Sequence, residues 1–552
     1  MNDMLRESEV LPKRPTSGLD FPVVGLGASA GGLRALITLF EHMTAAPDMS
    51  FVVILHLSPK HESNAAAILQ NATKMAVKQV QASTPIERNC VYVIPPTHSL
   101  AMHDGHLSLG ESRTSRGRPM AIDTFFRTLA EAHGERAIGI VLSGTGSDGS
   151  MGIARLKETG GVVMAQSPAD AEYSGMPDSA ISTGHVDIVL PAADIPQRLL
   201  ELWRNAQQIE MPKPESAGLQ VHPASSVDEA EDALRNIMSL LRKRTGHDFK
   251  HYKRATVLRR IERRLQVNGV SSLPAYLDFL NAHSAEAKFL LDDMLIGVTN
   301  FFRDRPAFEA LERDVIPTLF AESSGEHEQV RAWVPGCSSG EEAYTLAVLL
   351  CDARSRAERT REIQIFASDI DEDALAIGRQ GRYPDSIVAD MPPAYLRQYF
   401  SKEVNGYRVN EAVRKTVLFA NQDILRDPPF SRLDLVSCRN LLIYLNRDAQ
   451  RDILQMFHFA LRPGGYLLLG TSETADAAMN LFSIVDRQHR IYRSKLGRRS
   501  ARSLPVFPLG GLEHAAPTMK ADGAGRRRVA GVAELHQQLL LEEYAPASVV
   551  IN

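Results

Sequence analysis

Short apolar runs, bounded by glycine and polar residues, recur along the first part of the chain. Residues 21–26, 51–55 and 137–142 are apolar runs of strand length, and residues 33–43 follow the first run with the spacing of an amphipathic helix. Strands that alternate with helices are typical of a parallel sheet covered on both faces. The pattern therefore predicts a doubly wound α/β domain in this region.

A second series of apolar runs begins near residue 331. The first run ends in Pro335 and Gly336, small residues lead to Gly340, and residues 343–350 have helical spacing. Further runs lie at 363–367, 417–420, 433–437 and 457–469. This pattern predicts a second doubly wound parallel-sheet domain. Within residues 399–418, Asn405 and Gly406 separate two short β-like runs and predict a hairpin, so we expect a small inserted β subdomain.

Changes in composition set the expected domain boundaries. Residues 1–20 form a polar tail, residues 204–226 contain Pro212, Pro214 and Pro223 as a linker would, and residues 496–530 have the composition of a disordered segment. We expect the first α/β domain at 21–203, a small helical subdomain at 227–289, the second α/β domain at 290–495, and a helix with the start of another domain at 531–552.

Composition narrows the classes of function. The chain of 552 residues is 44% hydrophobic and 23% charged, with a formal net charge of −4, which is typical of globular domains and gives no overall case for binding nucleic acid. Cys90, Cys337, Cys351 and Cys438 lack paired spacing, so we expect neither disulfides nor a metal site. No apolar run approaches the ~20 residues that span a bilayer. We therefore expect a cytoplasmic protein without direct membrane insertion.

Three predicted strands of the first domain end in residues of complementary chemistry. The first leads into a Gly-x-Ser-x-Gly turn centred on Ser29, the second ends at His56, and the third leads to Asp148 in a glycine-rich loop. Because the carboxyl ends of parallel strands share one edge of a sheet, these side chains should lie close together. A serine nucleophile needs a base to take its proton and an acid to orient that base. The pattern therefore predicts a serine hydrolase.

The same turn also fits a dinucleotide-binding loop, with Gly25, Gly27 and Ala30 in the required positions. A nucleotide-binding fold would place an acid at the end of the next strand, where this chain has His56. Taken singly, the histidine could be structural and Asp148 a turn residue. Their joint placement at strand ends favours the hydrolase.

The glycine-rich loop of the second domain predicts an adenosyl ligand. Gly336 and Gly340 allow close approach of the backbone, and Asp369 ends the next strand, where an acid suits the hydroxyls of a ribose. The loop lacks the three-glycine pyrophosphate pattern, and it places Glu341 and Glu342 where a helix N-terminus would otherwise receive phosphate. Carboxylates disfavour an anionic ligand and suit a cationic one, so S-adenosyl-L-methionine is favoured over NAD.

Four blocks of sequence resemble, in this order, those of CheR-type chemoreceptor glutamate methyltransferases: TNFFR at 299–303, GCSSGEEAY at 336–344, SDID at 368–371 and CRNLLIY at 438–444. The resemblance covers about residues 227–493 and implies a cofactor site for S-adenosyl-L-methionine that is made of Thr299, Arg303, Glu341, Glu342, Asp369, Asp423, Ile424, Arg439 and Asn440. It also implies that Arg303 and Tyr444 position the substrate carboxylate. Phe301 and Phe302 are expected to pack in the core. Gly297 departs from the family, which often has a polar asparagine there.

The first domain resembles the catalytic domain of CheB-type protein-glutamate methylesterases. The resemblance covers about residues 21–203 and rests on GASAGG at 27–32, His56, VYVIPP at 91–96, GTGSDG at 144–149 and SGMP at 174–177. It implies that Ser29 attacks a glutamyl methyl ester, that His56 moves the proton and that Asp148 holds His56. Standard members carry a phosphorylatable receiver domain ahead of the esterase, and residues 1–20 are too short to contain one.

A basic run lies near the start of the methyltransferase resemblance and leaves two interpretations open. Residues 242–264 include Lys250, Lys253, Arg254, Arg259, Arg260, Arg263 and Arg264. These residues are either a solvated helix face or a docking surface for acidic receptor helices, since the methyltransferase family uses this helical region for substrate recognition. Aromatic residues do not interleave with the basic ones in a stacking pattern, which disfavours binding to nucleic acid.

The resemblances together predict a CheB–CheR hybrid that methylates glutamate side chains of chemoreceptors and hydrolyses the resulting esters. The expected partners are cytoplasmic receptor helices, and residues 531–552 resemble a signalling helix followed by the start of a PAS-type domain. The chain is therefore expected to be truncated, with a sensory or histidine-kinase module further on. A non-catalytic signalling scaffold and an NAD-dependent oxidoreductase are the alternatives.

Overall fold

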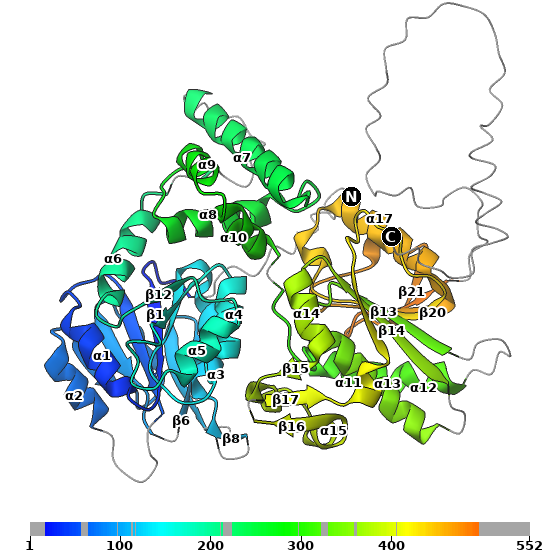
Figure 1. Cartoon of the computed structure of the whole chain (residues 1–552), viewed down its shortest axis with the longest axis horizontal. Coiled ribbons are helices and arrows are strands. Elements are labelled where there is room, and N and C mark those ends of the chain that lie inside the picture. The colour runs from blue at the N-terminus through cyan, green and yellow to red at the C-terminus, as the bar shows by residue number, and fades with distance from the viewer. Residues whose placement is uncertain are drawn as a thin grey trace, which may run out of the picture. The chain divides into compact units, whose positions relative to one another are not determined.

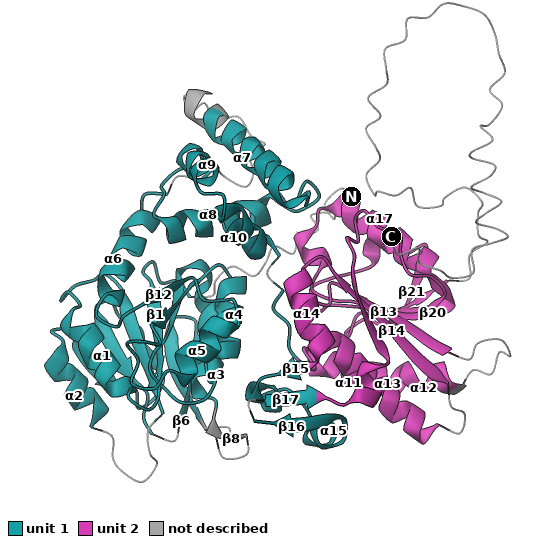
Figure 2. Ribbon diagram, in the orientation of Figure 1, with its two compact units in different colours: residues 1–300, 382–408 teal, residues 301–381, 409–552 magenta. Residues whose placement is uncertain are grey.

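The computed structural model describes residues 17–56, 64–96, 98–111, 114–115, 118–209, 211–212, 224–295, 297–321, 329–357, 361–404 and 406–495. The chain forms two compact units (Figure 2). The first comprises Met1–Asn300 and Arg382–Arg408, and the second comprises Phe301–Gly381 and Val409–Asn552. The expectations for residues 1–16 and 496–552, and for Asn405 in the predicted hairpin, lie outside the described residues.

The first unit is built around a seven-stranded sheet with the order β12-β11-β10-β1-β2-β5-β3 (Figure 1). The described pairings in this sheet are all parallel. The chain runs outward from β1 in one direction, then returns to β10 and runs outward in the other, so the switch point of the topology lies between β1 and β10. The strands are β1 (Val23–Ala28), β2 (Ser50–Leu55), β3 (Ala76–Gln79), β5 (Cys90–Val93), β10 (Ala137–Val141), β11 (Val162–Gln166) and β12 (Ile188–Leu190).

Helices cover both faces of this sheet. Val24 and Leu26 of β1 share one core cluster with side chains of α1 (Gly32–Glu41), α2 (Ala65–Ala72) and α6 (Ile195–Ala206). Val23 lies in the opposite cluster with side chains of α3 (Ala121–His133), α4 (Ser150–Glu158) and α5 (Gly175–Ser182). A Cβ added at Gly27 would lie 2.5 Å from the Cγ2 atom of Ile122. The glycine in β1 therefore allows α3 to pack directly against the strand.

Short elements complete the first part of this unit. They are β4 (Thr84–Pro85), β6 (His98–His103) and β7 (His106–Glu111), which form a three-stranded sheet, β8 (Thr114–Ser115), β9 (Arg118–Pro119) and η1 (Gly134–Arg136). The helical subdomain contains α7 (Ala224–Thr245), α8 (Arg254–Asn268), α9 (Leu273–Ala282) and α10 (Glu286–Met294). Helix α6 ends at Ala206 and α7 begins at Ala224, so helix occupies both ends of the 204–226 segment that was expected to be a linker.

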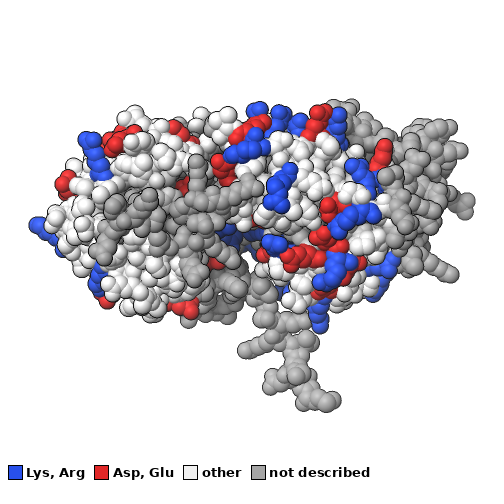
Figure 3. Space-filling view, turned by 90° about the horizontal axis from the view of Figure 1, so that it is seen from below, with Lys and Arg blue, Asp and Glu red and all other residues white. Residues whose placement is uncertain are grey.

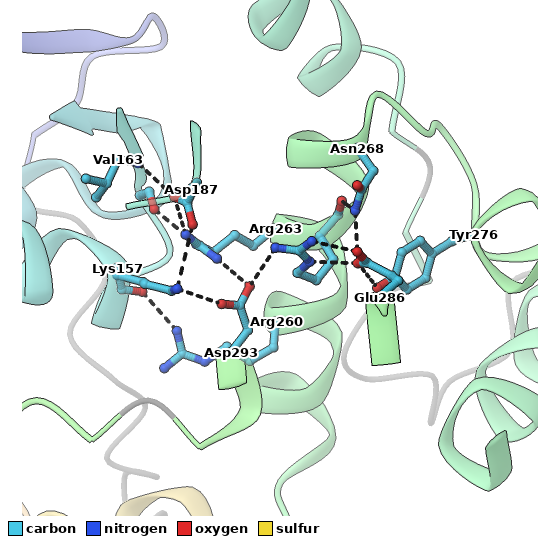
Figure 4. A network of polar contacts seen from close by, with 11 residues as sticks. Lys157, Val163, Asp187, Arg260, Arg263, Asn268, Tyr276, Glu286 and Asp293 are labelled. Atoms are coloured by element: carbon cyan, nitrogen blue, oxygen red, sulfur yellow. Dashed lines mark hydrogen bonds and ion pairs between the residues drawn. The ribbon is translucent and has the colours of Figure 1, made fainter. Parts of the chain in front are cut away.

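The helical subdomain is joined to the esterase-like sheet by a buried network of charges (Figure 4). Arg263 of α8 pairs with Asp187 beside β12 and with Asp293 of α10, and Lys157 of α4 lies 3.3 Å from Asp293. A second pair, Arg264 and Glu286, extends the network within the subdomain at 2.7 Å. Three cations thus face three carboxylates, which is the condition under which buried charges are tolerated.

Because of this buried network, both interpretations of the basic run are wrong for part of that run. Arg260 and Arg263 are 1% exposed and Arg264 is 6% exposed, so none of them can be a solvated helix face or a surface for another protein. Arg260 donates to the backbone carbonyl of Lys157 at 3.1 Å. These arginines recur on the face of α8 that turns toward the esterase-like sheet, a distinction that the sequence alone could not make.

The second unit contains a seven-stranded sheet with the order β18-β14-β13-β19-β20-β22-β21. Strands β18 to β20 pair in parallel, whereas β22 pairs antiparallel with both β20 and β21. Its switch point lies between β13 and β19. The strands are β13 (Gln329–Pro335), β14 (Glu362–Asp369), β18 (Val417–Asn421), β19 (Leu433–Cys438), β20 (Leu461–Leu469), β21 (Phe482–Asp486) and β22 (Ile491–Ser494).

The helices of this unit surround its sheet (Figure 1). They are α11 (Arg305–Asp314), α12 (Ile316–Ala321), α13 (Glu341–Arg356), α14 (Glu372–Gln380), α16 (Glu411–Arg414) and α17 (Arg447–Ala460), with short turns η3 (Leu442–Tyr444) and η4 (Asp476–Ala478). The prediction of two α/β domains with mainly parallel sheets is confirmed.

A three-stranded sheet with the order β15-β17-β16 forms the small β subdomain. Its elements are β15 (Arg382–Tyr383), η2 (Asp385–Ala389), α15 (Pro393–Tyr399), β16 (Phe400–Glu403) and β17 (Gly406–Val409). The sheet begins earlier than the predicted 399–418 because β15 pairs with β17. A Cβ at Gly406 would lie 2.2 Å from the carbonyl oxygen of Tyr383, so only glycine fits at this position.

Candidate active sites

Ser29 follows β1 directly, at the switch point of the first sheet. Its backbone N–H donates to the carbonyl of Ser143 at 3.0 Å, which ties the turn to the segment after β10. Gly31 has φ of 72°, a left-handed conformation that a glycine adopts readily, and it begins α1. A Cβ at Gly144 would lie 2.9 Å from the Cβ of Ser29. The glycine-rich loop after β10 therefore lies against the serine.

His56 follows β2, the strand next to β1. Ala28 and Leu55 are paired in register, and the His56 backbone N–H donates to the carbonyl of Ala28 at 3.1 Å. The ring Nε2 atom of His56 lies 2.8 Å from Oδ2 of Asp148. The structure therefore brings His56 and Asp148 together, at the same sheet edge as Ser29.

Asp148 is held by the first turn of α3 as well as by His56. Its Oδ2 accepts from the backbone N–H of Ile122 at 3.1 Å, and its Oδ1 accepts from that of Asp123 at 3.0 Å. A helix N-terminus carries backbone N–H groups without partners in the helix, and it favours a negative charge. The carboxylate that orients His56 is thus fixed on both oxygens.

In the second unit, the loop between β13 and α13 wraps around Asp369, the last residue of β14. The backbone N–H groups of Ser338 and Asp371 donate to Asp369 at 2.7 and 3.0 Å. Gly336 and Gly340 have φ of 68° and 94° and make the turn that brings this loop to the strand end. Burial raises the pKa of Asp369. A buried carboxyl group at this position can accept hydrogen bonds from the hydroxyl groups of a ribose.

The two glutamates at the start of α13 have different surroundings. Oε2 of Glu341 accepts from the Ser339 hydroxyl at 2.7 Å. Glu342 turns toward the switch point, where its Oε1 accepts from the Ser437 hydroxyl at 2.6 Å and its Oε2 lies 3.6 Å from Arg439. Burial raises the pKa of Glu342, although the charge of Arg439 opposes this shift.

Arg439 connects β19 with the segment before α11. Its Nη2 atom donates to the backbone carbonyl of Arg303 at 2.8 Å and to Asp304 at 2.9 Å. The guanidinium lies over the ring of Phe308, 4.8 Å from the centroid. The structure thus joins the predicted site residues Glu342 and Arg439 to the backbone of Arg303. Phe301 and Phe302 are buried, as expected for core residues.

Glu473 is a residue of this site that the sequence analysis missed. It is 4% exposed, and its carboxylate accepts from the backbone N–H groups of Asn440 (2.9 Å), Ile443 (3.2 Å) and Gly470 (2.8 Å). Asn440 has φ of 61°, so this carboxylate holds a left-handed turn directly after Arg439. The sequence does contain one sign of this residue, because the glutamate lies shortly after the apolar run that forms β20.

The remaining predicted residues are Asp423, Ile424 and Tyr444 in the second unit and Thr299 in the first. Asp423 follows β18 and accepts from the N–H of Leu425 at 2.9 Å, and Ile424 is half-buried beside it. Tyr444 is a half-buried residue of η3. Thr299 lies in the last residues of the first unit. The roles assigned to these residues stay predictions.

A pocket of about 360 Å³ lies on the helical subdomain. Its apolar lining comes from Leu234, Met238, Phe249, Tyr252 and Val257, and its charged lining from Arg242, Asp248, Lys250 and Arg254. Elsewhere, on the face shown in Figure 3, acidic and basic side chains are intermingled, so no extended area of that face has one sign of charge.

The folds and their strand-edge residues are those expected of a serine esterase followed by a methyltransferase with an adenosyl site. Family models agree with this division. The CheB methylesterase model matches residues 24–199, the all-alpha domain of the CheR methyltransferase matches 232–295, and its S-adenosylmethionine-binding domain matches 297–491.

The chain belongs to the CheR family of chemotaxis protein methyltransferases and carries a CheB methylesterase domain ahead of the methyltransferase. The chemotaxis protein methyltransferase of Salmonella typhimurium is 31% identical over 262 residues, which are 46% of this chain and 86% of that protein. These matches support both enzyme activities, with S-adenosyl-L-methionine as the cofactor and chemoreceptors as the class of substrate.

Two further matches extend into the first unit. An uncharacterized 104.1 kDa protein of Rhodobacter capsulatus is 38% identical over 440 residues, 78% of this chain. The matched part is 46% of that relative, so the chain spans about half of its length. The crystal structure of the CheB methylesterase catalytic domain of Thermotoga maritima aligns with 33% of this chain and 100% of its own, with 29% identity and a TM-score of 0.32.

Two features are absent from the described residues. None of the helices in those ranges has the length and apolar character needed to cross a membrane. Within the same ranges, no group of three or more histidine, cysteine, aspartate or glutamate side chains is arranged to hold a metal ion.

Proposed function

We propose that this chain catalyses two opposed reactions on glutamate side chains of chemoreceptor-like proteins. The second unit transfers a methyl group from S-adenosylmethionine to the glutamate, and the first unit hydrolyses the methyl ester. The observation that carries the proposal is the 2.8 Å contact between His56 and Asp148 at the sheet edge where Ser29 follows β1. This edge is the place at which open α/β sheets gather catalytic groups.

For the esterase, Ser29 is the nucleophile. Its Oγ attacks the ester carbonyl carbon while Nδ1 of His56 takes the hydroxyl proton, and Asp148 stabilises the resulting imidazolium through Nε2. The bond to the methoxy group breaks, and His56 returns the proton so that methanol leaves. Water then attacks the acyl-enzyme in the same way and releases the glutamate and Ser29. Backbone N–H groups beside Ser29 and in the loop of Thr145 and Gly146 are the proposed donors to the oxyanion.

For the methyltransferase, the residues present fit S-adenosylmethionine. This cofactor supplies a methyl group on a positively charged sulfonium. Asp369 is placed to hold the ribose, and the carboxylates of Glu341 and Glu342 suit the cationic part of the ligand. The substrate glutamate is already ionised at neutral pH, so the chain has to supply alignment and exclusion of water rather than a base. Arg303 and Tyr444 are the proposed positioning residues for the substrate carboxylate.

The pocket on the helical subdomain is the proposed docking surface for the substrate. With Arg260, Arg263 and Arg264 buried, the exposed cations of the basic run include three that line the pocket: Arg242, Lys250 and Arg254. Arg242 also pairs with Asp248 at 3.2 Å. An apolar floor with a cationic rim complements a receptor helix that carries glutamates. Such helices lie on the cytoplasmic side of the membrane, where we place this activity. A sensory or histidine-kinase module is a further proposed partner.

The test uses methyl-labelled S-adenosylmethionine with receptor-containing membranes. We expect label to enter a receptor as a base-labile ester and to be released as methanol. Release should fall at least a hundredfold in the Ser29→Ala variant, because the nucleophile is absent. Ser182→Ala, an exposed serine in α5, is the matched control and should behave as wild type. Cofactor binding without any transfer of label would favour the non-catalytic scaffold instead.

A further inference from the structure

Asp123 lies behind the pair of His56 and Asp148, on the first turn of α3. It is 2% exposed, and its Oδ1 accepts from the backbone N–H groups of Met151 at 3.0 Å and Gly152 at 2.7 Å, which are in the first turn of α4. Asp148 immediately precedes α4 and caps α3. Each aspartate therefore accepts hydrogen bonds from the first turn of the helix associated with the other, and four backbone hydrogen bonds hold the two side chains at these adjoining helix turns.

The second carboxyl oxygen of Asp123 is the unusual feature. Oδ2 is buried, and no donor among the described residues reaches it. Two carboxylates cannot bond to each other because both only accept, whereas a proton on one makes it a donor. Burial, with the negative charge of Asp148 added, raises the pKa of Asp123 well above its ordinary value, and the charge of Arg127 and the amide of Gly152 oppose the shift. A shared proton would remove the cost of an unpartnered buried oxygen.

We propose that Asp123 is a positioning residue of the esterase site, which shares a proton with Asp148 and thereby fixes the carboxylate that holds His56. This inference rests on the proposed esterase function and adds a residue to it. The pair carries one negative charge in place of two, and that charge stays on Asp148. A hydrogen bond from Asp123 makes Asp148 less basic, so Asp148 remains a carboxylate while His56 carries the proton of Ser29 during turnover.

Two variants of the full chain separate a positioning role from a purely structural one. In Asp123→Asn the side-chain amide keeps an acceptor for α4 and a donor for Asp148, so hydrolysis of p-nitrophenyl acetate should stay within about threefold of wild type. In Asp123→Ala both are lost, and kcat should fall by at least about tenfold with KM little changed. Wild type should also lose activity as pH rises through the raised pKa of Asp123, and Asp123→Asn should lack this loss. Glu131→Gln, an exposed acid on the same helix, is the control.

Unfolding provides a readout that does not depend on activity. An acid whose pKa is raised in the folded state stabilises most below its unfolded pKa, and this stability is lost as pH rises through the folded value. Asparagine does not titrate. The difference in Tm between Asp123→Asn and wild type should therefore increase from pH 5 to pH 8. The corresponding difference for Glu131→Gln should stay constant over this range.

Each remaining outcome overturns the inference or a defined part of it. A Tm difference that is flat with pH excludes the shared proton. If Asp123→Asn folds but its kcat falls as far as that of Asp123→Ala, the shared proton is excluded as well. If Asp123→Ala folds and has the kcat and pH profile of wild type, Asp123 serves only as a helix cap. If wild type hydrolyses neither p-nitrophenyl acetate nor methylated receptor, the proposed function fails, and the unfolding series still decides whether the proton is shared.

Discussion

Arg439 donates a hydrogen bond to the backbone carbonyl of Arg303, 136 residues earlier in the chain. The same guanidinium lies between the carboxylates of Asp304 and Glu342 and over the ring of Phe308. One side chain thus fixes the segment that enters the second unit to the strand that ends at its switch point. Arg439 is buried, so its loss should affect both folding stability and the cofactor site.

Arg439→Met should impair both cofactor binding and folding stability. The substitution leaves the buried carboxylate of Glu342 without its cation, and breaking a buried pair of this kind costs about 3–5 kcal/mol. We expect affinity for S-adenosylmethionine to fall at least about tenfold and the Tm to drop, as measured by calorimetry. Arg451→Met, which removes an exposed arginine paired with Asp448 on α17, should change neither. Unchanged affinity in Arg439→Met would exclude a role in the cofactor site.

Asp369→Ala should weaken cofactor binding more selectively. Its carboxylate accepts from the N–H groups of Ser338 and Asp371, and hydrogen bonds to a charged group contribute about 1.5–3 kcal/mol each. Loss of a ribose contact and of the loop anchor should lower affinity for S-adenosylmethionine by roughly 30-fold or more. Titration calorimetry measures this. Glu362→Ala, at the exposed start of the same strand, should bind as wild type does. Equal losses in both variants would mean that Asp369 has no specific contact.

Asp293→Ala should destabilise the first unit strongly. The substitution leaves Lys157 and Arg263 buried without one of their carboxylates, at a cost of about 3–5 kcal/mol in the free energy of unfolding. Urea unfolding monitored by circular dichroism gives this value. Asp278→Ala, an exposed aspartate on α9, should change stability by less than about 0.5 kcal/mol. A wild-type midpoint in Asp293→Ala would show that the network contributes nothing.

Glu262→Gln should change how stability depends on pH. Burial and the nearby charge of Glu135 raise the pKa of Glu262 to about 7. An acid with a raised pKa stabilises the fold most below its ordinary pKa, and this stability is lost as pH rises toward the folded value. Wild type should therefore lose stability between pH 5 and pH 8. Glu262→Gln should lose about 1–3 kcal/mol less over this range. Identical pH profiles in urea unfolding would contradict the assignment.

The residues that the sequence could place are those that end strands. An apolar run of strand length determines where its last residue lies. Ser29 and His56 could therefore be assigned to the carboxyl edge of the first sheet, and Asp369 to that of the second, before any coordinates were available. The contact between His56 and Asp148 followed from the same reasoning. Strand ends are predictable because a sheet has only one carboxyl edge.

The residues that the sequence could not place act through burial and through contacts with backbone groups. Asp123 and Glu473 accept hydrogen bonds from main-chain N–H groups, which every residue carries and no pattern marks. Arg263 looks like any other residue of a basic run until α8 packs against α4 and β12. Tertiary packing decided these roles, and composition and spacing alone do not encode it.

The charges buried between α8 and the first sheet also determine where this protein can be divided. A fragment that stops before α7 would leave Lys157 and Asp187 at a new surface without Asp293 and Arg263, the oppositely charged residues that pair with them. A fragment that ends at Asn300 keeps the whole network. In this chain the first α/β domain is therefore expected to keep its stability only while the helical subdomain stays attached to it.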